Sequence, residues 1–416
     1  MVAILGYSRE QIAGAVRQMY GRVARQPTAG FHFPVGRDAA VALGYEREQL
    51  DNLPDATLAA FAGVGHPFVA DRIQEGDTVL DIGAGAGVDA LIASRLVGPR
   101  GRVIAVDLTP EMSRKLSHVA SANGYDNVSA IEGSAEQLPV RDSSIDVITS
   151  NGALNLVPDK RRAVREMFRA LRPGGTLQLA DVVIRRPVTV DCDSDPRLWV
   201  ECVVGATVDE ELLDLLVDEG FASPEVLYRH DYFALSPSAQ TREIAASFDA
   251  HSLALRVDRD QTPLPAATHW WRRVNPMRLL RLFWRRGAAG LASLGLALFT
   301  CYGLLAAFAL LPLLGLNMAL DDGLWAGGIL VFTWLAVAAV TAGVRQHQSY
   351  LPLGLASLGA SVVSYALLVN YNMLVEISGF ALLAAGVAFD WHWRRRRQRE
   401  VLGIDSAANL SRVDPD

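Results

Sequence analysis

The chain has 416 residues, a formal net charge of −6 and a mean hydropathy of +0.19, and 50% of its residues are hydrophobic. Its 3 cysteines are too few for a disulfide framework, and we expect them to stay reduced in a cytoplasmic protein. The N-terminus has neither a basic start nor a long apolar core, so no cleavable signal peptide is expected.

The first half of the chain alternates between predicted strands and helices. Ser8 is expected to cap a helix from about Glu10 to Val23, within a helical and loop lid at residues 1–60. Residues 61–257 are expected to form an α/β domain, because such alternation is typical of a parallel sheet with helices on both faces. Strands are predicted at Thr78–Ile82, Arg102–Asp107, Val128–Glu132, Ile145–Ser150 and Thr176–Asp181, with late strand character at Val226–Ala234; helices are predicted at Val88–Leu96, Glu111–Asn123, Lys160–Leu171 and Glu210–Glu219.

A glycine-rich loop follows the first predicted strand. Gly83, Gly85 and Gly87 alternate after Asp81, and the second strand ends about twenty residues later in Asp107. Glycines let a backbone approach a ligand, and an acid at the second strand end takes a ribose diol. A bare glycine alternation also occurs in plain tight turns, but the two acids favour a nucleoside cofactor. The variant resembles the class I S-adenosylmethionine methyltransferases, whose sulfonium cofactor carries no pyrophosphate for a helix terminus.

The remaining cofactor contacts are expected from the loops after the second and third strands. Asp81 and the three glycines are assigned to the methionine end, and Asp107 with Leu108 to the ribose and adenine. Ser134, Ala135 and Glu136 follow the third strand, where a short polar side chain and free amides are expected to line the adenine rim.

Candidate catalytic residues come from three separate segments. Asn151 follows the fourth strand and is expected to bind the cofactor and face the methyl group, since ligands bind outside the carboxyl ends of such strands. Tyr20, on the first helix, is expected to close over the substrate or simply to pack. Cys202, after the fifth strand, is a candidate acceptor ligand, although a lone cysteine is often a small buried hydrophobe. His66 is placed near the entrance, and His118 on a solvated helix face.

These segments, in this order, resemble the arsenite methyltransferases over about residues 16–256. The resemblance implies a class I methyltransferase fold, Rossmann-like with a mostly parallel seven-stranded sheet, and S-adenosylmethionine as cofactor. In that family trivalent arsenic is held by cysteine thiolates, which suit a soft ion. A cytoplasmic thiol, glutathione or thioredoxin, is the expected reductant. The likeness is carried by Val16-Arg-Gln-Met-Tyr20-Gly, Gly101 to Asp107, Leu108-Thr-Pro-Glu-Met112, Ser150-Asn151, Asn155-Leu-Val-Pro-Asp-Lys160 and Trp199 to Ala206.

The chain departs from that family at the acceptor ligands. Cys202 stands at one ligand position, but Val64 and Gly152 stand at two others, and the late ligand position falls near Phe248. Cys192 is a further candidate thiolate for the metal or metalloid. Because one thiolate cannot build a three-thiolate site, the expected acceptor class widens from arsenic(III) to another thiophilic element or a thiol.

From Ala288 onward the chain is largely apolar, and residues 288–391 are predicted to form an all-α domain of four transmembrane helices. Each apolar run is near the ~20 residues that cross a bilayer, and such segments must be helical in lipid. Glu376 and Asp390 lie near run ends, where they are expected to reach the headgroups. The four runs are Ala288–Leu314, Leu324–Val344, Tyr350–Val369 and Met373–Phe389.

Basic residues around these runs indicate an orientation. Arginines precede the first run, separate the second from the third at Arg345, and follow the fourth from Arg394, whereas the other two connections hold no Lys or Arg. By the positive-inside rule, the N-terminal domain and the basic tail at 392–416 face the cytoplasm of an inner or plasma membrane. Within the linker 258–287, Trp270–Arg286 is predicted to be an interfacial helix on anionic lipid rather than a nucleic-acid site.

The apolar half resembles the MerC family of four-helix mercury-uptake proteins over about residues 287–393. The likeness lies in Leu310–Leu316 and Gly343–Pro352. That family carries cysteines in its first helices, whereas this chain keeps Cys301 there, so a plain membrane anchor and a transport domain both stay open.

Three functions follow from these patterns. The first is a membrane-tethered methyltransferase of a soft element or thiol. The second is a methyltransferase of a membrane lipid or quinone, which would need a base for an oxygen or carbon acceptor. The third is a MerC-like metal-ion transporter whose first domain binds the cofactor as a sensor. The expected partners are a small-molecule or metalloid acceptor and the lipid bilayer, with no nucleic acid.

Overall fold

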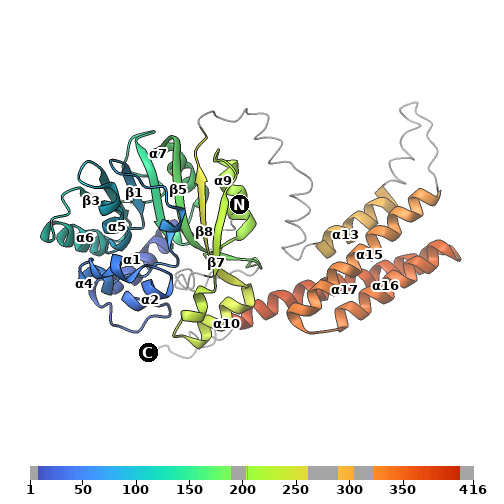
Figure 1. The fold of residues 1–416 in the computed structure, drawn as a ribbon. Coiled ribbons are helices and arrows are strands. Elements are labelled where there is room, and N and C mark those ends of the chain that lie inside the picture. Colours follow the sequence, from blue (N-terminus) through green and yellow to red (C-terminus); the bar gives the residue numbers. More distant parts are fainter. Residues whose placement is uncertain (1–7, 189–202, 204, 261–288, 304–321, 403–416) are drawn as a thin grey trace. The chain divides into compact units, whose positions relative to one another are not determined.

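The computed structural model describes residues 8–188, 203, 205–260, 289–303 and 322–402 (Figure 1). The chain divides into two compact units, residues 1–273 and 274–416. The predicted interfacial helix Trp270–Arg286 lies outside the described residues, as do Cys192 and Cys202.

The first unit is built on an eight-stranded sheet in the order β3-β2-β1-β4-β5-β8-β7, with β6 paired to β5. Strands β1 to β6 pair with one another in parallel, and β8 runs antiparallel to both β5 and β7. The chain order reverses between β1 and β4, which is where open α/β sheets bind ligands. The strands are β1 (Thr78–Ile82), β2 (Arg102–Asp107), β3 (Val128–Glu132), β4 (Ile145–Asn151), β5 (Leu171–Ile184), β6 (Thr207–Val208), β7 (Glu225–His230) and β8 (Ala250–Asp258).

The sheet is mostly parallel, as predicted, but it has eight strands rather than seven, and neither β6 nor the antiparallel β8 was located individually. The buried polar residues His251 and Ser252 interrupt β8, so it is not a continuous apolar run. The late strand predicted at Val226–Ala234 ends at His230, because Asp231 caps a 3₁₀ helix at Tyr232–Leu235 and accepts a hydrogen bond from the Ala234 amide.

The helices of the first unit follow the predicted ones closely. Ser8 caps α1, where its hydroxyl accepts from the Gln11 amide at 3.1 Å and the Gln11 side chain accepts from the Ser8 amide at 2.8 Å. The short helices α2 to α4 were not predicted individually within the lid at residues 1–60. The helices are α1 (Arg9–Arg25), α2 (Arg37–Ala42), α3 (Arg47–Asp51), α4 (Asp55–Ala59), α5 (Val88–Val97), α6 (Pro110–Ala122), α7 (Lys160–Ala170), α9 (Asp209–Asp218) and α10 (Ala239–Phe248).

The core of the first unit lies along the central strands. Leu80, Ile148 and Leu177, from β1, β4 and β5, are wholly buried. Strands buried on both faces read as continuous apolar runs, which is why the sequence located them so well.

The second unit is a bundle of apolar helices, drawn in orange and red in Figure 1. Helices α16 and α17 approach closely at Gly359 and Gly379, where a Cβ built on Gly359 would lie 2.7 Å from the Gly379 carbonyl oxygen. Small residues permit such backbone contact between membrane helices. The elements are α13 (Ala289–Leu298), a π-helical turn at Phe299–Gly303, α15 (Asp322–His347), α16 (Leu351–Leu368) and α17 (Met373–Val401).

Three described helices are long and apolar enough to cross a membrane, within Trp325–Arg345, Leu351–Leu368 and Met373–Val401. The first predicted span is described only at its start, so the count of four spans stays a prediction. Helix α17 also continues through the basic residues that were predicted to begin a tail at 392.

The two acids in the predicted spans do not lie where the sequence suggested. Instead of reaching for headgroups, Glu376 and Asp390 are 0% and 3% exposed inside the bundle. The Cys301 thiol donates to Glu376 at 2.9 Å, and Asp390 accepts from His347 at 2.9 Å and from Arg394 at 2.8 Å. Buried polar groups require such partners. His347 on α15 and Cys301 come from other segments, whereas Arg394 lies one turn beyond Asp390 on α17 itself.

The close approach of α16 and α17 gives a stability test. Gly359→Ala should destabilise the bundle by about 1–3 kcal/mol, because the added methyl meets backbone atoms that cannot move aside. Gly354→Ala, on the same helix with nothing within 4 Å, is the matched control and should not destabilise it. Thermal unfolding in detergent measures both, and equal melting temperatures for the two variants would contradict this packing.

Candidate active site

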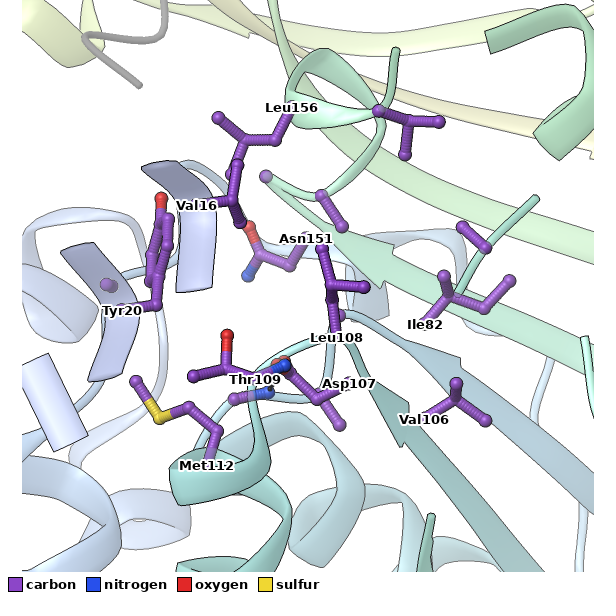
Figure 2. A pocket seen from close by; sticks show the side chains of 18 of the residues that line it. Val16, Tyr20, Ile82, Val106, Asp107, Leu108, Thr109, Met112, Asn151 and Leu156 are labelled. Carbon is purple, nitrogen blue, oxygen red and sulfur yellow. Dashed lines mark hydrogen bonds between the residues drawn. The ribbon is translucent and has the colours of Figure 1, made fainter. Parts of the chain in front are cut away.

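A cavity of about 380 Å³ lies at the carboxyl ends of β1, β2 and β4. Its size is within the range of small-molecule sites. Figure 2 shows Tyr20, Asp107, Met112 and Asn151 around the same space. One face of α1 lines the cavity through Val16, Tyr20 and neighbouring turns, so the first helix serves as its cover.

The predicted glycine loop forms one wall of this cavity. Gly85 and Gly87 have φ angles of +54° and +98°, which favour glycine. A Cβ on Gly87 would overlap the Leu116 side chain, while a Cβ on Gly85 would meet nothing within 4 Å. The loop therefore exposes bare backbone to the cavity, as close approach to a nucleoside requires.

Asp107 lines the cavity at the end of β2 and also holds the loop. One carboxylate oxygen accepts from the Gly85 amide at 2.8 Å, and the other accepts from the Thr109 amide at 2.7 Å. Burial raises the pKa of Asp107 from its usual value. A carboxylate can accept about four hydrogen bonds, so Asp107 keeps capacity for a further donor, such as a ribose hydroxyl.

Asp81 is the one predicted cofactor residue that does not line the cavity. Its carboxylate is 2% exposed, with one oxygen accepting from the Thr149 hydroxyl at 2.7 Å. The other oxygen has no hydrogen-bond partner in the described part of the chain. Burial and the neighbouring Asp89 carboxylate raise the pKa of Asp81 well above its usual value.

The residues predicted to contact the adenine lie together in the cavity wall. Leu108, Ser134, Ala135 and Glu136 all line it. The Glu136 amide donates to the Ser134 hydroxyl at 3.1 Å, and the Glu136 side chain accepts from the Asp159 amide at 2.9 Å. These bonds fix the rim in place.

Asn151 lines the cavity, but its side chain amide is occupied by neighbouring segments. Its oxygen accepts from the Val64 and Gly65 amides at 2.8 and 3.1 Å. Its nitrogen donates to the Gly65 carbonyl, the Tyr45 hydroxyl and Asp89 at 2.9–3.0 Å. Asn151 therefore clamps the loop at 64–65 onto the end of β4.

The partners of Asn151 were not predicted from the sequence. The Tyr45 hydroxyl donates to Asp89 at 2.5 Å, and the Tyr228 hydroxyl accepts from the His66 amide at 2.6 Å. These residues come from four distant parts of the chain, so no local spacing signals the cluster. The one available hint was an acid, Asp89, in the first turn of the helix after the glycines.

Lys160 and Asp181 fix the loop that follows β4. The Lys160 ammonium donates to the Asn155 and Val157 carbonyls, both at 2.9 Å, and Asp181 accepts from the Leu154 amide at 2.8 Å. Burial lowers the pKa of Lys160 to about 7 and raises the pKa of Asp181 to about 7. Both hold the turn that carries Leu156, which lines the cavity.

At the positions expected for acceptor ligands, the structure shows apolar contacts. Val64 packs against Gly152, where a Cβ would lie 3.0 Å from a Val64 methyl group. Phe248 is 1% exposed at the end of α10, in the core. Within the described residues, no group of three His, Cys, Asp or Glu is placed to hold a metal ion.

The two histidines named from the sequence have different surroundings. His66 packs against the Tyr45 ring, with 4.1 Å between centroids, and does not line the cavity. Burial lowers its pKa to about 4. His118 is exposed on α6, as predicted.

Comparisons with known proteins agree with this geometry. Residues 73–227 match the family described as "Methyltransferase domain", and residues 288–394 match "MerC mercury resistance protein". An arsenite methyltransferase of Halobacterium salinarum is 36% identical over 208 residues, which is 50% of this chain and 51% of that protein. A ubiquinone/menaquinone biosynthesis C-methyltransferase of Hahella chejuensis is 41% identical over 113 residues, 26% of this chain and 45% of that protein.

One solved structure is also similar in sequence. An arsenic(III) S-adenosylmethionine methyltransferase from Chlamydomonas reinhardtii is 30% identical, with 55% of this chain and 75% of that chain covered and a TM-score of 0.43. The chain spans about half the length of the two curated relatives from Halobacterium salinarum and Hahella chejuensis.

The first unit is therefore a class I S-adenosylmethionine-dependent methyltransferase domain. The chain joins this domain, which has arsenite methyltransferases as homologues, to a C-terminal domain of the MerC family. The cavity fits the cofactor, because the bare glycine loop, the Asp107 carboxylate and residues 134–136 line one space.

The glycine loop gives a binding test. Gly87→Ala should weaken binding of S-adenosylhomocysteine by at least about tenfold, because φ of +98° and the overlap with Leu116 force the loop to move. Gly124→Ala is the control, because Gly124 also has a positive φ, of +72°, but has open space around it and does not line the cavity. This variant therefore introduces backbone strain alone. Calorimetric titration of the full chain in detergent measures both. Unchanged binding by Gly87→Ala would show that the cofactor does not dock on this loop.

His66 gives a pH test. Its pKa is lowered from 6.5 to about 4, so between these values the folded protein binds fewer protons than the unfolded chain. Stability should therefore fall as the pH is lowered through this window, by at most about 3 kcal/mol from this residue. His66→Gln should reduce that loss and the exposed His118→Gln should not, when melting temperatures are compared from pH 7 to pH 4. Equal slopes for both variants would contradict the burial of His66.

Proposed function

We propose that this protein is a membrane-bound S-adenosylmethionine-dependent methyltransferase that acts on arsenic(III) or on another thiophilic element or thiol. The observation that carries the proposal is the single cavity that unites the glycine loop and Asp107 with the clamped loop at Asn151. The 36% identity to an arsenite methyltransferase supports the soft acceptor.

The reaction makes modest demands on the side chains. S-adenosylmethionine, when bound, supplies a methyl group that is already activated by its sulfonium. The protein must align the acceptor and exclude water. Val16 and Tyr20 on α1 and Leu156 on the opposite loop form an apolar cover for this purpose. A soft lone pair needs no base, and no histidine lines the cavity in the described part of the chain.

The acceptor ligands must come from outside the contact between Val64 and Gly152, which holds no thiol. Cys202 and Cys192 are the remaining cysteines of the first unit, and we assign them to the acceptor. Thiolates bind soft ions well, and a cytoplasmic thiol such as glutathione or thioredoxin would supply a further one and act as reductant.

We further propose that the MerC-family domain crosses an inner or plasma membrane four times, with the methyltransferase domain and the C-terminus in the cytoplasm. Three described candidate spans and the arginines beyond the last one support this orientation. The domain would keep the enzyme beside acceptors that arrive through, or leave by, the membrane.

A second candidate is methylation of a membrane quinone or lipid. The 41% identity to a quinone-biosynthesis C-methyltransferase favours it, and so do the apolar residues Ile82, Val106 and Met112 in the cavity lining. A carbon acceptor needs a base, however, and Asp89 already accepts two hydrogen bonds from Tyr45 and Asn151.

Membranes that contain the full chain can decide between the candidates. Labelled S-adenosylmethionine is added to these membranes together with arsenite, mercuric ion, selenite, thiols or lipid extract, and the label is measured in each fraction. We expect label in the arsenic or another soft fraction and a loss of at least about tenfold in Cys202→Ser, with little change in Cys301→Ser as the matched thiol control.

The other outcomes are distinct. Label in the lipid fraction that is insensitive to Cys202→Ser would replace the first candidate by the second. Absence of both label and S-adenosylhomocysteine with every acceptor would overturn catalysis and leave a cofactor-binding transport protein.

A further inference from the structure

Asp89 is an acid in the cavity wall for which the sequence predicted no role. It lies in the first turn of α5, directly after the glycine loop, and lines the cavity while being 6% exposed. The Tyr45 hydroxyl fixes one carboxylate oxygen at 2.5 Å, and the Asn151 amide fixes the other at 3.0 Å. Its orientation is therefore set before any ligand arrives.

The strand order indicates which end of the cofactor reaches Asp89. Asp107 ends β2, and the adenine rim at 134–136 follows β3, on the outer side of β2. A nucleoside whose ribose is at Asp107 and whose base is at this rim must send its 5′ substituent the other way, towards β1 and β4. Asp89 and Asn151 line the cavity on that side.

Among the described residues, no positively charged group is found to influence the Asp89 carboxyl. The described groups that influence its carboxyl most are its burial and its hydrogen bonds to Tyr45 and Asn151, both neutral. Asp81 lies close enough for the Asp89 charge to raise its pKa, and one Asp81 oxygen has no hydrogen-bond partner in the described residues. Buried carboxylates in such surroundings favour a bound cation.

We propose that Asp89, and not Asp81, is the counter-ion of the α-ammonium group at the methionine end of the cofactor. This inference rests on the proposed function, because it presumes that the cavity binds a sulfonium nucleoside. The N⁺–H donors of the ammonium group would take the lone pairs that Tyr45 and Asn151 leave on the carboxylate. Asp81 lies behind the loop and does not line the cavity, so it would not touch the ligand.

The same arrangement makes cofactor affinity depend on pH. Burial raises the pKa of Asp89 to about 6. The titratable groups that face its carboxyl are Asp81, Tyr45 and Tyr228. An ammonium ligand binds the ionised carboxylate, so affinity should be full above pH 7 and fall by up to about tenfold per unit below pH 6. A ligand without an ammonium group should not follow this profile.

Calorimetric titration of the full chain in detergent, with three ligands, tests the proposal. S-adenosylhomocysteine carries both the ammonium and the carboxylate, its decarboxylated analogue carries the ammonium alone, and 5′-methylthioadenosine carries neither. Asp89→Asn should weaken the first two on the order of 10- to 100-fold and leave the third within about twofold.

Two matched variants separate charge from structure. Tyr45→Phe disturbs the same network but keeps the charge, so it should affect all three ligands alike. Asp81→Asn changes a neighbouring acid that does not line the cavity, and it should weaken the ammonium ligands much less than Asp89→Asn.

Two results would overturn the assignment of Asp89 while leaving the proposed function intact. One is unchanged binding of S-adenosylhomocysteine by Asp89→Asn, and the other is an equal loss for 5′-methylthioadenosine, which would mean a purely structural role. Failure of the wild-type chain to bind any of the three ligands would instead overturn the proposed function itself.

Discussion

The site depends on the hydrogen bonds of the Asn151 side chain. A single amide at the end of β4 satisfies the backbone of the loop at 64–65 and also binds Tyr45 and Asp89. A partly buried amide with both ends hydrogen-bonded fixes geometry strongly, since movement leaves polar groups unpaired. The cavity wall at the end of β4 is thereby held without help from the ligand.

Features of the site that depend on neighbouring residues were predictable from the sequence. The glycine loop, Asp107 and the rim at 134–136 each follow a strand directly, and the carboxyl ends of parallel strands converge. The role of Asp81 was assigned from the same reasoning, but the structure turns its carboxylate to Thr149 behind the loop. Pattern alone places an acid at a strand end and does not say which way its side chain faces.

Features that depend on distant contacts were not predictable. Tyr45 and Asp89 are 44 positions apart, and Asp89 and Asn151 are 62 apart, so neither pair leaves a periodic signal. Strand β8 was missed for another reason, because the buried polar residues His251 and Ser252 interrupt its apolar sequence. In the second unit, the end of the fourth apolar run near Asp390 indicated the end of a helix. Helix α17 instead continues past Asp390, which is buried and bonded to His347 and Arg394.

The contact between Val64 and Gly152 bears on how an acceptor could be held. A methyl group of Val64 fills the space in front of Gly152, whose φ of +72° is costly for any other residue. This part of the wall therefore presents an apolar surface to an incoming acceptor, without atoms that could serve as ligands. Any thiolate that binds the acceptor must reach the cavity from another segment or arrive with the acceptor itself. The described part of the first unit thus combines a rigid methyl-donor site with a wall that offers an acceptor no thiol.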